Sequence, residues 1–337
     1  MPYDQRASLD QPIGSGLPRD SATQPEVDTD FLHGGRNRID DTPIAREAEA
    51  ALAAMSRPAE PWPTPGKTRV FVVANQKGGV GKTTTTVNIA ASLAQYGAKV
   101  LVVDLDPQGN ASTALNIEHH SEVPSIYDVL IERYTMEEIV QAAPDIPNLY
   151  CAPATIDLAG AEIELVSMVA RESRLQRALA SYRGSMDYIL IDCPPSLGLL
   201  TVNALVASEE VLIPIQCEYY ALEGLGQLLR NIELVRAHLN QGLYISTILL
   251  TMYDARTRLA SQVADEVRTH FPDQVLRTAI PRSVRISEAP SYSQTVMTWD
   301  PASTGALAYR EAAHEIAERW AAGIPSQLNP IETEVAR

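Results

Sequence analysis

A glycine-rich run at 76–84, QKGGVGKTT, has the composition of a phosphate-binding loop. It follows an apolar, β-branched run and precedes a stretch with helical spacing, which is the context that such a loop requires. Glycine lets the backbone wrap closely enough for N–H groups to meet phosphate oxygens, and the start of a helix adds partial positive charge. Lys82 should reach the β- and γ-phosphates, and the Thr83 hydroxyl should bind Mg²⁺. The predicted nucleotide contacts in this run are Lys77, Gly78, Gly79, Val80, Gly81, Lys82, Thr83 and Thr84.

The loop departs from the common pattern G-x-x-x-x-G-K-[ST] at position 76, which is glutamine, and it carries a second lysine, Lys77. Of the 27 cationic side chains in the chain only four are lysine, and two of those four lie in this loop. In a chain so biased towards arginine, this choice indicates that the two lysines perform a task that arginine could not.

Short apolar runs that alternate with helical stretches predict the elements that position this loop. The expected strands are 70–75, 99–106, 188–192, 210–215, 245–252 and 274–280. The expected helices follow the loop and lie at 168–182, 198–207, 221–240, 257–270 and 303–322. Uniformly apolar strands that alternate with helices predict an α/β, doubly wound, mostly parallel sheet with helices on both faces.

Composition sets the domain limits and excludes several classes of protein. Residues 1–66 are rich in Pro, Gly, Ser and Asp and predict a disordered tail with a proline-rich linker; 67–322 predict one folded domain, and 323–337 a polar tail. There is no apolar run long enough to cross a membrane and no secretory signal, and the three cysteines suit buried thiols in a reducing compartment. A net charge of −15 restricts any nucleic-acid contact to a local basic patch.

Several motifs together carry a specific resemblance. KGGVGKTT resembles a deviant Walker A motif, DLDPQGN (104–110) resembles a switch I segment, and DYILIDCPPSLGLLTVNAL (187–205) resembles a Walker B strand with switch II. The segments CEYYALEGLGQL, LLTMYDART and IPRSVRISEAPS add to it. Over residues 69–322 the chain is similar to the ParA/Soj family of chromosome-partitioning ATPases, which are P-loop NTPases of the ParA/MinD superfamily.

The resemblance implies an ATPase that uses ATP and Mg²⁺, with catalytic roles for Lys77, Lys82 and Asp106. Lys77 would be the signature lysine that contacts the ATP of a second subunit in an ATP-bound homodimer. Asp106 would orient the attacking water and could also join the magnesium shell, and Asp192 would hold Mg²⁺ through water. Asp104 could either join that shell or brace the loop. For the adenine base the family implies contacts from Pro281 and from Ser283, where relatives usually carry asparagine.

The resemblance also implies non-specific binding of double-stranded DNA. Arg256 and Arg285 are the residues implied for phosphate contact, with Arg282 and Arg258 nearby in the same two loops. No helix-turn-helix or zinc spacing that would read base edges is present. A ParB-type centromere-binding protein is the implied partner, and the implied location is the cytoplasm, on the nucleoid.

Three alternatives remain open at this stage. A MinD-like ATPase that cycles on membranes would need a basic amphipathic C-terminal helix, whereas this chain ends in a proline-containing polar stretch. An iron–sulfur reductase would need cysteines placed to hold a cluster; Cys193 follows Asp192, and a visible absorption spectrum would decide. A nucleotide-binding scaffold without significant hydrolysis would leave Lys77 or Asp106 idle.

Overall fold

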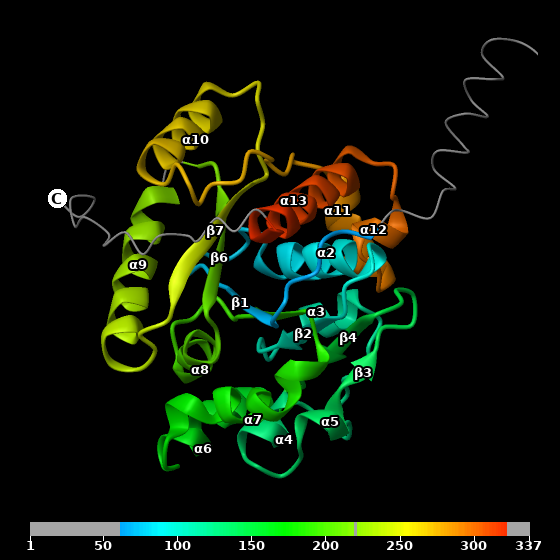
Figure 1. Ribbon diagram of the computed structural model, residues 1–337, viewed down its shortest axis with the longest axis vertical. Coiled ribbons are helices and arrows are strands. Elements are labelled where there is room, and N and C mark those ends of the chain that lie inside the picture. The colour runs from blue at the N-terminus through cyan, green and yellow to red at the C-terminus, as the bar shows by residue number, and fades with distance from the viewer. Residues whose placement is uncertain (1–60, 219–220, 322–337) are drawn as a thin grey trace, which may run out of the picture. The chain divides into compact units, whose positions relative to one another are not determined.

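The computed structural model describes residues 61–218 and 221–321. Residues 1–60 of the predicted tail and linker (1–66), and the whole predicted tail 323–337, lie outside those residues. A seven-stranded sheet runs through the centre in the order β3-β4-β2-β5-β1-β6-β7 (Figure 1). All neighbouring pairs are parallel except β3 with β4. The strands are β1 (Arg69–Val73), β2 (Val100–Asp104), β3 (Gln141–Ala142), β4 (Leu149–Ala152), β5 (Tyr188–Asp192), β6 (Glu210–Gln216) and β7 (Tyr244–Thr251). The α/β, doubly wound, mostly parallel architecture predicted from the sequence is confirmed.

Helices cover both faces of this sheet, and each face has its own apolar core (Figure 1). Alternate residues of β1 serve the two cores, with Val70 and Val72 on one face and Phe71 and Val73 on the other. The Phe71 face packs against α2 (Lys82–Gln95), α3 (Asn110–Ala114), α12 (Val296–Trp299) and α13 (Thr304–Ala321). The Val70 face packs against α4 (Ile126–Leu130), α5 (Met136–Ile139), α6 (Leu158–Val166), α7 (Arg174–Tyr182), α8 (Leu199–Ala207), α9 (Ala221–His238) and α10 (Arg258–His270).

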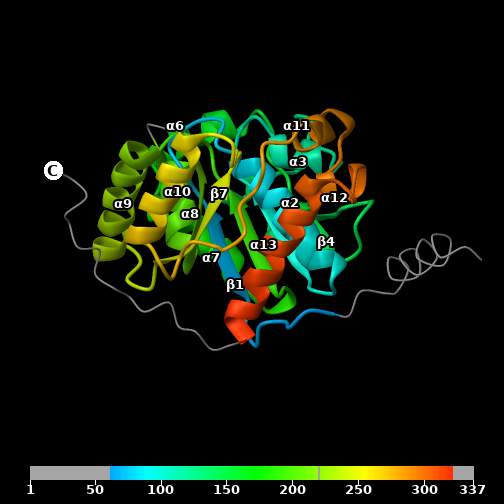
Figure 2. The ribbon, with the colours of Figure 1, turned by 90° about the horizontal axis from the view of Figure 1, so that it is seen from above.

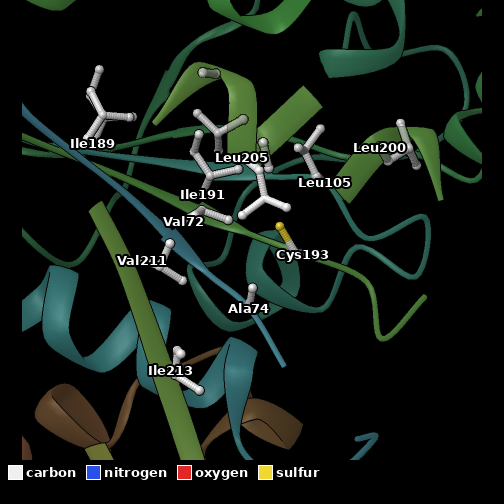
Figure 3. Close-up of a cluster of buried hydrophobic side chains, with 14 of the residues drawn as sticks. Val72, Ala74, Leu105, Ile189, Ile191, Cys193, Leu200, Leu205, Val211 and Ile213 are labelled. Atoms are coloured by element: carbon white, nitrogen blue, oxygen red, sulfur yellow. The ribbon is translucent and has the colours of Figure 1, made fainter. Parts of the chain in front are cut away.

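The core behind the Val70 face shows why the central strands are apolar throughout (Figure 3). Ile191 of β5 lies beside Val72 of β1, and Leu205 of α8 lies next to Ile191. Burial on both faces leaves no position for a polar side chain until a strand ends. Charged side chains of the central strands therefore lie at the strand ends, and Asp104 and Asp192 occupy the carboxyl ends of β2 and β5.

Strand register brings these terminal residues together. Asp104, the last residue of β2, is paired with Asp192, the last residue of β5, and Asp192 is also paired with Val73 at the end of β1. The chain that leaves β1 enters the glycine-rich loop directly. Two carboxylates and the phosphate-binding loop therefore share one edge of the sheet.

The segment 274–280, predicted as a strand, is not one. It runs beside β7 through isolated bridges at Val275 and Pro281. The backbone N–H groups of Arg277 and Thr278 donate to the carboxylate of Glu315 on α13 and are therefore lost to the sheet. The buried carboxylate of Glu315 thus takes the place of β7 as the acceptor for these two N–H groups.

The helix predicted at 168–182 starts later, at Arg174 in α7. Ala170 has a left-handed backbone, with φ of 51°, and a 3₁₀ turn at Arg171–Ser173 follows it. This change of direction separates α7 from α6. The sequence did not predict α6, β3 or β4. The other predicted strands and helices are confirmed within a few residues of their expected ends.

Trp62, within the stretch predicted as linker, packs against the domain. Its ring stacks on Tyr96 at a centroid distance of 3.9 Å and lies 4.9 Å from the ring of His314. Its backbone N–H donates to the carbonyl of Tyr96 at 3.1 Å. The chain is thus fixed to the C-terminal end of α2 and to α13 before β1 begins. Among the described helices, none has the length and apolar character needed to cross a membrane.

Candidate nucleotide and DNA-binding site

The glycine-rich loop has the backbone that its sequence requires. Gly79 and Gly81 adopt left-handed conformations, with φ of 74° and 88°, which side chains disfavour. Gly81 is the N-cap of α2, and the first free N–H groups of that helix face the loop. A Cβ built on Gly78 or on Gly79 would meet no atom within 4 Å, so the space over the loop is open. A phosphate group fits this arrangement of free N–H groups and open space.

Lys82 is buried beneath the loop, and its ammonium donates to the carbonyl oxygen of Lys77 at 3.3 Å. Burial lowers the pKa of Lys82, while the charges of Asp192 and Asp106 oppose that shift. A partly desolvated ammonium with one long hydrogen bond has donor capacity left for an anion.

Thr83 and Asp192 supply oxygen atoms side by side. The Thr83 hydroxyl donates to Oδ2 of Asp192 at 2.7 Å, and the Thr86 hydroxyl lies 3.1 Å from Oδ1. Burial, together with the charge of Asp104, raises the pKa of the Asp192 carboxyl. A divalent cation beside this carboxyl would favour its charged form. The hydroxyl and carboxylate oxygens therefore fit Mg²⁺, which prefers oxygen ligands.

Asp104 braces the next loop. Its carboxylate accepts hydrogen bonds from the backbone N–H and the hydroxyl of Ser112, both at 2.8 Å, and from the N–H of Asp106 at 3.2 Å. Burial raises the pKa of Asp104, and the hydrogen bonds from Ser112 oppose this. Of the two roles left open for Asp104, these contacts favour bracing. The Asp106 carboxylate accepts only the N–H of Gln108 among the hydrogen bonds described, at 3.0 Å.

Lys77 is paired with an acidic residue that the sequence analysis did not single out. Its Nζ lies 2.8 Å from Oε2 of Glu218, which follows the end of β6 at the same edge of the sheet. The other Glu218 oxygen accepts from Gln216 and lies 3.9 Å from Arg282. The only sequence signal for Glu218 was its position just beyond an apolar strand. A polar residue there falls at the edge of the sheet that holds the phosphate loop.

The two arginine-bearing loops lie against one another. The N–H of Tyr253 donates to Ile280, and the N–H of Arg282 donates to the carbonyl of Tyr253. Arg256 is 89% exposed and forms a two-pronged pair with Asp254, and the Arg256 guanidinium lowers the pKa of that carboxyl to about 2. Arg285, in α11 (Val284–Glu288), pairs with Glu288 and Asp300 instead. The predicted DNA contacts are therefore exposed, and each has an acidic neighbour.

The residues predicted to contact adenine lie in the same region. Pro281 forms the bridge to Tyr253 at the end of β7, and Ser283 is the N-cap of α11. The structure thus brings the phosphate loop and the acidic residues together. Pro281 and Ser283 follow the segment that runs beside β7.

The sequence matches the family model described as "AAA domain" over residues 68–245. It is 54% identical to sporulation initiation inhibitor protein Soj of Bacillus subtilis over 249 residues, which cover 74% of this chain and 98% of that protein. It is 48% identical to chromosome partitioning protein ParA of Myxococcus xanthus over 258 residues, 77% of this chain and 90% of that protein.

Among solved structures, the fold is similar to that of cobyrinic acid a,c-diamide synthase from Mycobacterium smegmatis with bound ADP and magnesium. The TM-score is 0.66 at 40% identity, covering 76% of this chain and 96% of that chain. The two relatives, one a sporulation and one a partitioning protein, match over 98% and 90% of their own length. This chain therefore belongs to the ParA/Soj family of chromosome-partitioning ATPases.

Proposed function

We propose that this protein is an ATP-dependent switch that binds DNA as an ATP-bound dimer and releases it on hydrolysis. The observation that carries this proposal is the phosphate loop at the carboxyl edge, with the Thr83–Asp192 pair beside it and Lys77 close by. A similar structure that holds ADP and magnesium supports the same nucleotide and ion here.

The loop residues 77–84 would hold the phosphates of ATP through backbone N–H groups, and Lys82 would neutralise charge on the outer phosphates. Thr83 would bind Mg²⁺ directly and Asp192 would do so through water. When bound, the ion would neutralise charge that develops between the outer phosphates. Pro281 and Ser283 would contact the adenine. The sequence predicts an ATPase domain at 67–322. In this proposal the domain begins earlier, at Trp62, because the ring of Trp62 packs on Tyr96.

Lys77 would act across the dimer interface, on the ATP of the second subunit. Its side chain is 32% exposed, and its ammonium is held only by a surface ion pair among the described side-chain contacts. Such a pair contributes between about 0 and 1 kcal/mol, so exchange of Glu218 for a phosphate costs little. A cation supplied in trans would make hydrolysis depend on dimerisation.

Asp106 would orient the attacking water, and it could also contribute to the magnesium shell. The loop that carries it is braced by Asp104 and Ser112, so its position is fixed before nucleotide binds. Preorganisation of this kind lowers the cost of placing water in line with the leaving phosphate.

DNA binding would use Arg256, Arg285 and Arg282, through phosphates and without sequence preference. The carboxylates that pair with these arginines would reduce the affinity of a single subunit for DNA. A dimer would present two sets of these arginines to the same DNA. A ParB-type partner would stimulate a weak intrinsic ATPase, and the protein would act in the cytoplasm on the nucleoid.

Phosphate release measured with ATP, DNA and a ParB-type partner tests the enzymatic part. We expect slow release alone and faster release with both additions, and Lys82→Ala should abolish it by removing nucleotide binding. No release under any condition, with ATP still bound, would support the scaffold alternative and contradict the proposal.

A further inference from the structure

The helix α6 carries apolar side chains on two separate faces. Leu158, Ala161 and Leu165 are fully buried against the core. Ile163 and Val166 lie on another face and are 80% and 60% exposed. Ile156 before the helix and Val169 after it extend this exposed surface. We refer to these four side chains, Ile156, Ile163, Val166 and Val169, as the α6 stripe.

The α6 stripe is a cluster. Ile163 and Val166 are three residues apart in α6, a spacing that places them on one side of the helix, and Ile156 and Val169 lie within three residues of its two ends. Single exposed apolar residues are common on proteins, but several that gather on one element mark an interaction surface.

The α6 stripe lies at the edge of the sheet that holds the nucleotide site. The helix follows β4 at its carboxyl end, and Figure 2 shows α6 at the edge towards which the strands point. Glu162 of α6 lies 3.5 Å from the backbone N of Leu200, in the segment after Asp192. A Cβ built on Gly198 would come within 1.9 Å of the Glu162 carboxylate, so that carboxylate lies directly against the segment before α8. Glu162 thus joins α6 to the start of α8, the helix that follows Asp192 along the chain.

The surroundings of the α6 stripe favour another apolar surface as its occupant. Glu164 accepts a hydrogen bond from Tyr127 at 2.9 Å, and Glu172 pairs with Arg171 at the same distance. These carboxylates already have partners within the chain and offer little to a basic segment of another protein. A two-fold symmetric contact requires a surface that complements itself, which an apolar patch does and a charged patch does not.

We propose that the α6 stripe is buried against a second copy of this chain in the ATP-bound dimer. This inference rests on the dimerisation in "Proposed function", since Lys77 can reach the second nucleotide only if the carboxyl edges of two subunits face each other. The stripe would supply the apolar contact of that interface, and Glu162 would connect it to the segment after Asp192.

The test compares Ile163→Ser/Val166→Ser with Leu234→Ser, which removes a similarly exposed side chain (59%) from α9. Analytical ultracentrifugation of the full chain, over a concentration series with Mg²⁺ and a non-hydrolysable ATP analogue, gives the dimer dissociation constant. We expect this constant to rise by about tenfold or more in the double variant. Leu234→Ser should leave it unchanged, and both variants should bind the analogue like the parent.

Dimerisation of the double variant at the parent's dissociation constant would overturn the inference and leave the proposed switch intact. The same holds if only stimulation by a ParB-type partner is lost, which would assign the α6 stripe to that partner. Equal weakening by Leu234→Ser would also overturn it, because the effect would not be specific to α6. A parent protein that stays monomeric with saturating analogue would overturn both the inference and the proposed function.

Discussion

Lys77 and Glu218 form an ion pair, with 2.8 Å between Nζ and Oε2, that ties the phosphate loop to the end of β6. Both side chains are partly exposed, and the second Glu218 oxygen lies within 3.9 Å of Arg282. One carboxylate thus stands between the lysine proposed to act in trans and an arginine proposed to contact DNA. The pair occupies the ammonium of Lys77 with a carboxylate of its own chain.

Replacing Glu218 with glutamine should favour the ATP-bound dimer. Lys77 would no longer have to leave a charged partner, and a surface pair of this kind corresponds to a change of up to about fivefold. The ATP concentration for half-maximal dimerisation, measured by sedimentation, should fall by about two- to fivefold. Glu288→Gln, which removes a comparable partner from Arg285, is the control and should leave dimerisation unchanged. Weaker dimerisation in Glu218→Gln would show that this carboxylate supports the dimer.

Lys77→Ala should separate nucleotide binding from dimerisation. ATP should still bind, because the N–H groups of the loop and Lys82 remain, while the dimer and hydrolysis should be lost. Lys82→Ala is the matched comparison and should lose nucleotide binding itself. Equilibrium binding of a fluorescent ATP analogue and sedimentation with ATP give the two readouts. A normal dimer with normal turnover in Lys77→Ala would remove the role in trans.

Asp106→Ala should trap the dimer. The side chain accepts only one described hydrogen bond, from Gln108, so its loss should leave the fold intact. Without a group to orient water, hydrolysis should slow by about 10²-fold or more while the ATP-bound dimer accumulates. Asp104→Asn should instead lower stability, because Asp104 braces the loop through Ser112. An Asp106→Ala protein that hydrolyses ATP at the parent rate would contradict the assignment.

Much of the site was predictable because its chemistry lies in contiguous motifs. The strands were predictable as well, since burial on both faces makes them continuously apolar, as in Tyr188–Asp192. Other features depend on tertiary contacts. Helix α6 has apolar residues on two faces and so lacks a one-sided period, and the expected strand at 274–280 loses its ladder to Glu315. The Lys77–Glu218 pair joins residues 141 positions apart, which no local pattern reveals.

Trp62 and the residues before it should behave differently on removal. Deleting residues 1–60 should leave ATPase activity and DNA binding nearly unchanged, since their composition offers little to bury. Trp62→Ala should lower the free energy of unfolding by about 1–2 kcal/mol, because the ring stacks on Tyr96 and packs on His314. Thermal denaturation measures both, and Trp62→Phe should recover most of the loss. A large fall in Tm on deleting 1–60 would indicate that this segment packs on the domain.

The exposed arginines should control DNA affinity without affecting the dimer. Arg256→Glu/Arg285→Glu should weaken binding by about tenfold or more on any sequence, because the contacts are to phosphates. Arg277→Glu changes an 84% exposed arginine that is not among the predicted DNA contacts and serves as the control. Fluorescence anisotropy on two unrelated duplexes gives the comparison. Retained affinity in the double variant would place the DNA surface elsewhere.

The most direct test of the proposed switch is DNA affinity measured with ATP, with ADP and without nucleotide, over a series of salt concentrations. A dimer presents twice the phosphate contacts of a monomer and releases about twice the counterions. The account predicts tight binding only with ATP, with a slope of log K against log salt about twice that of the other two states. Equal affinity and equal slope in all three states would contradict it.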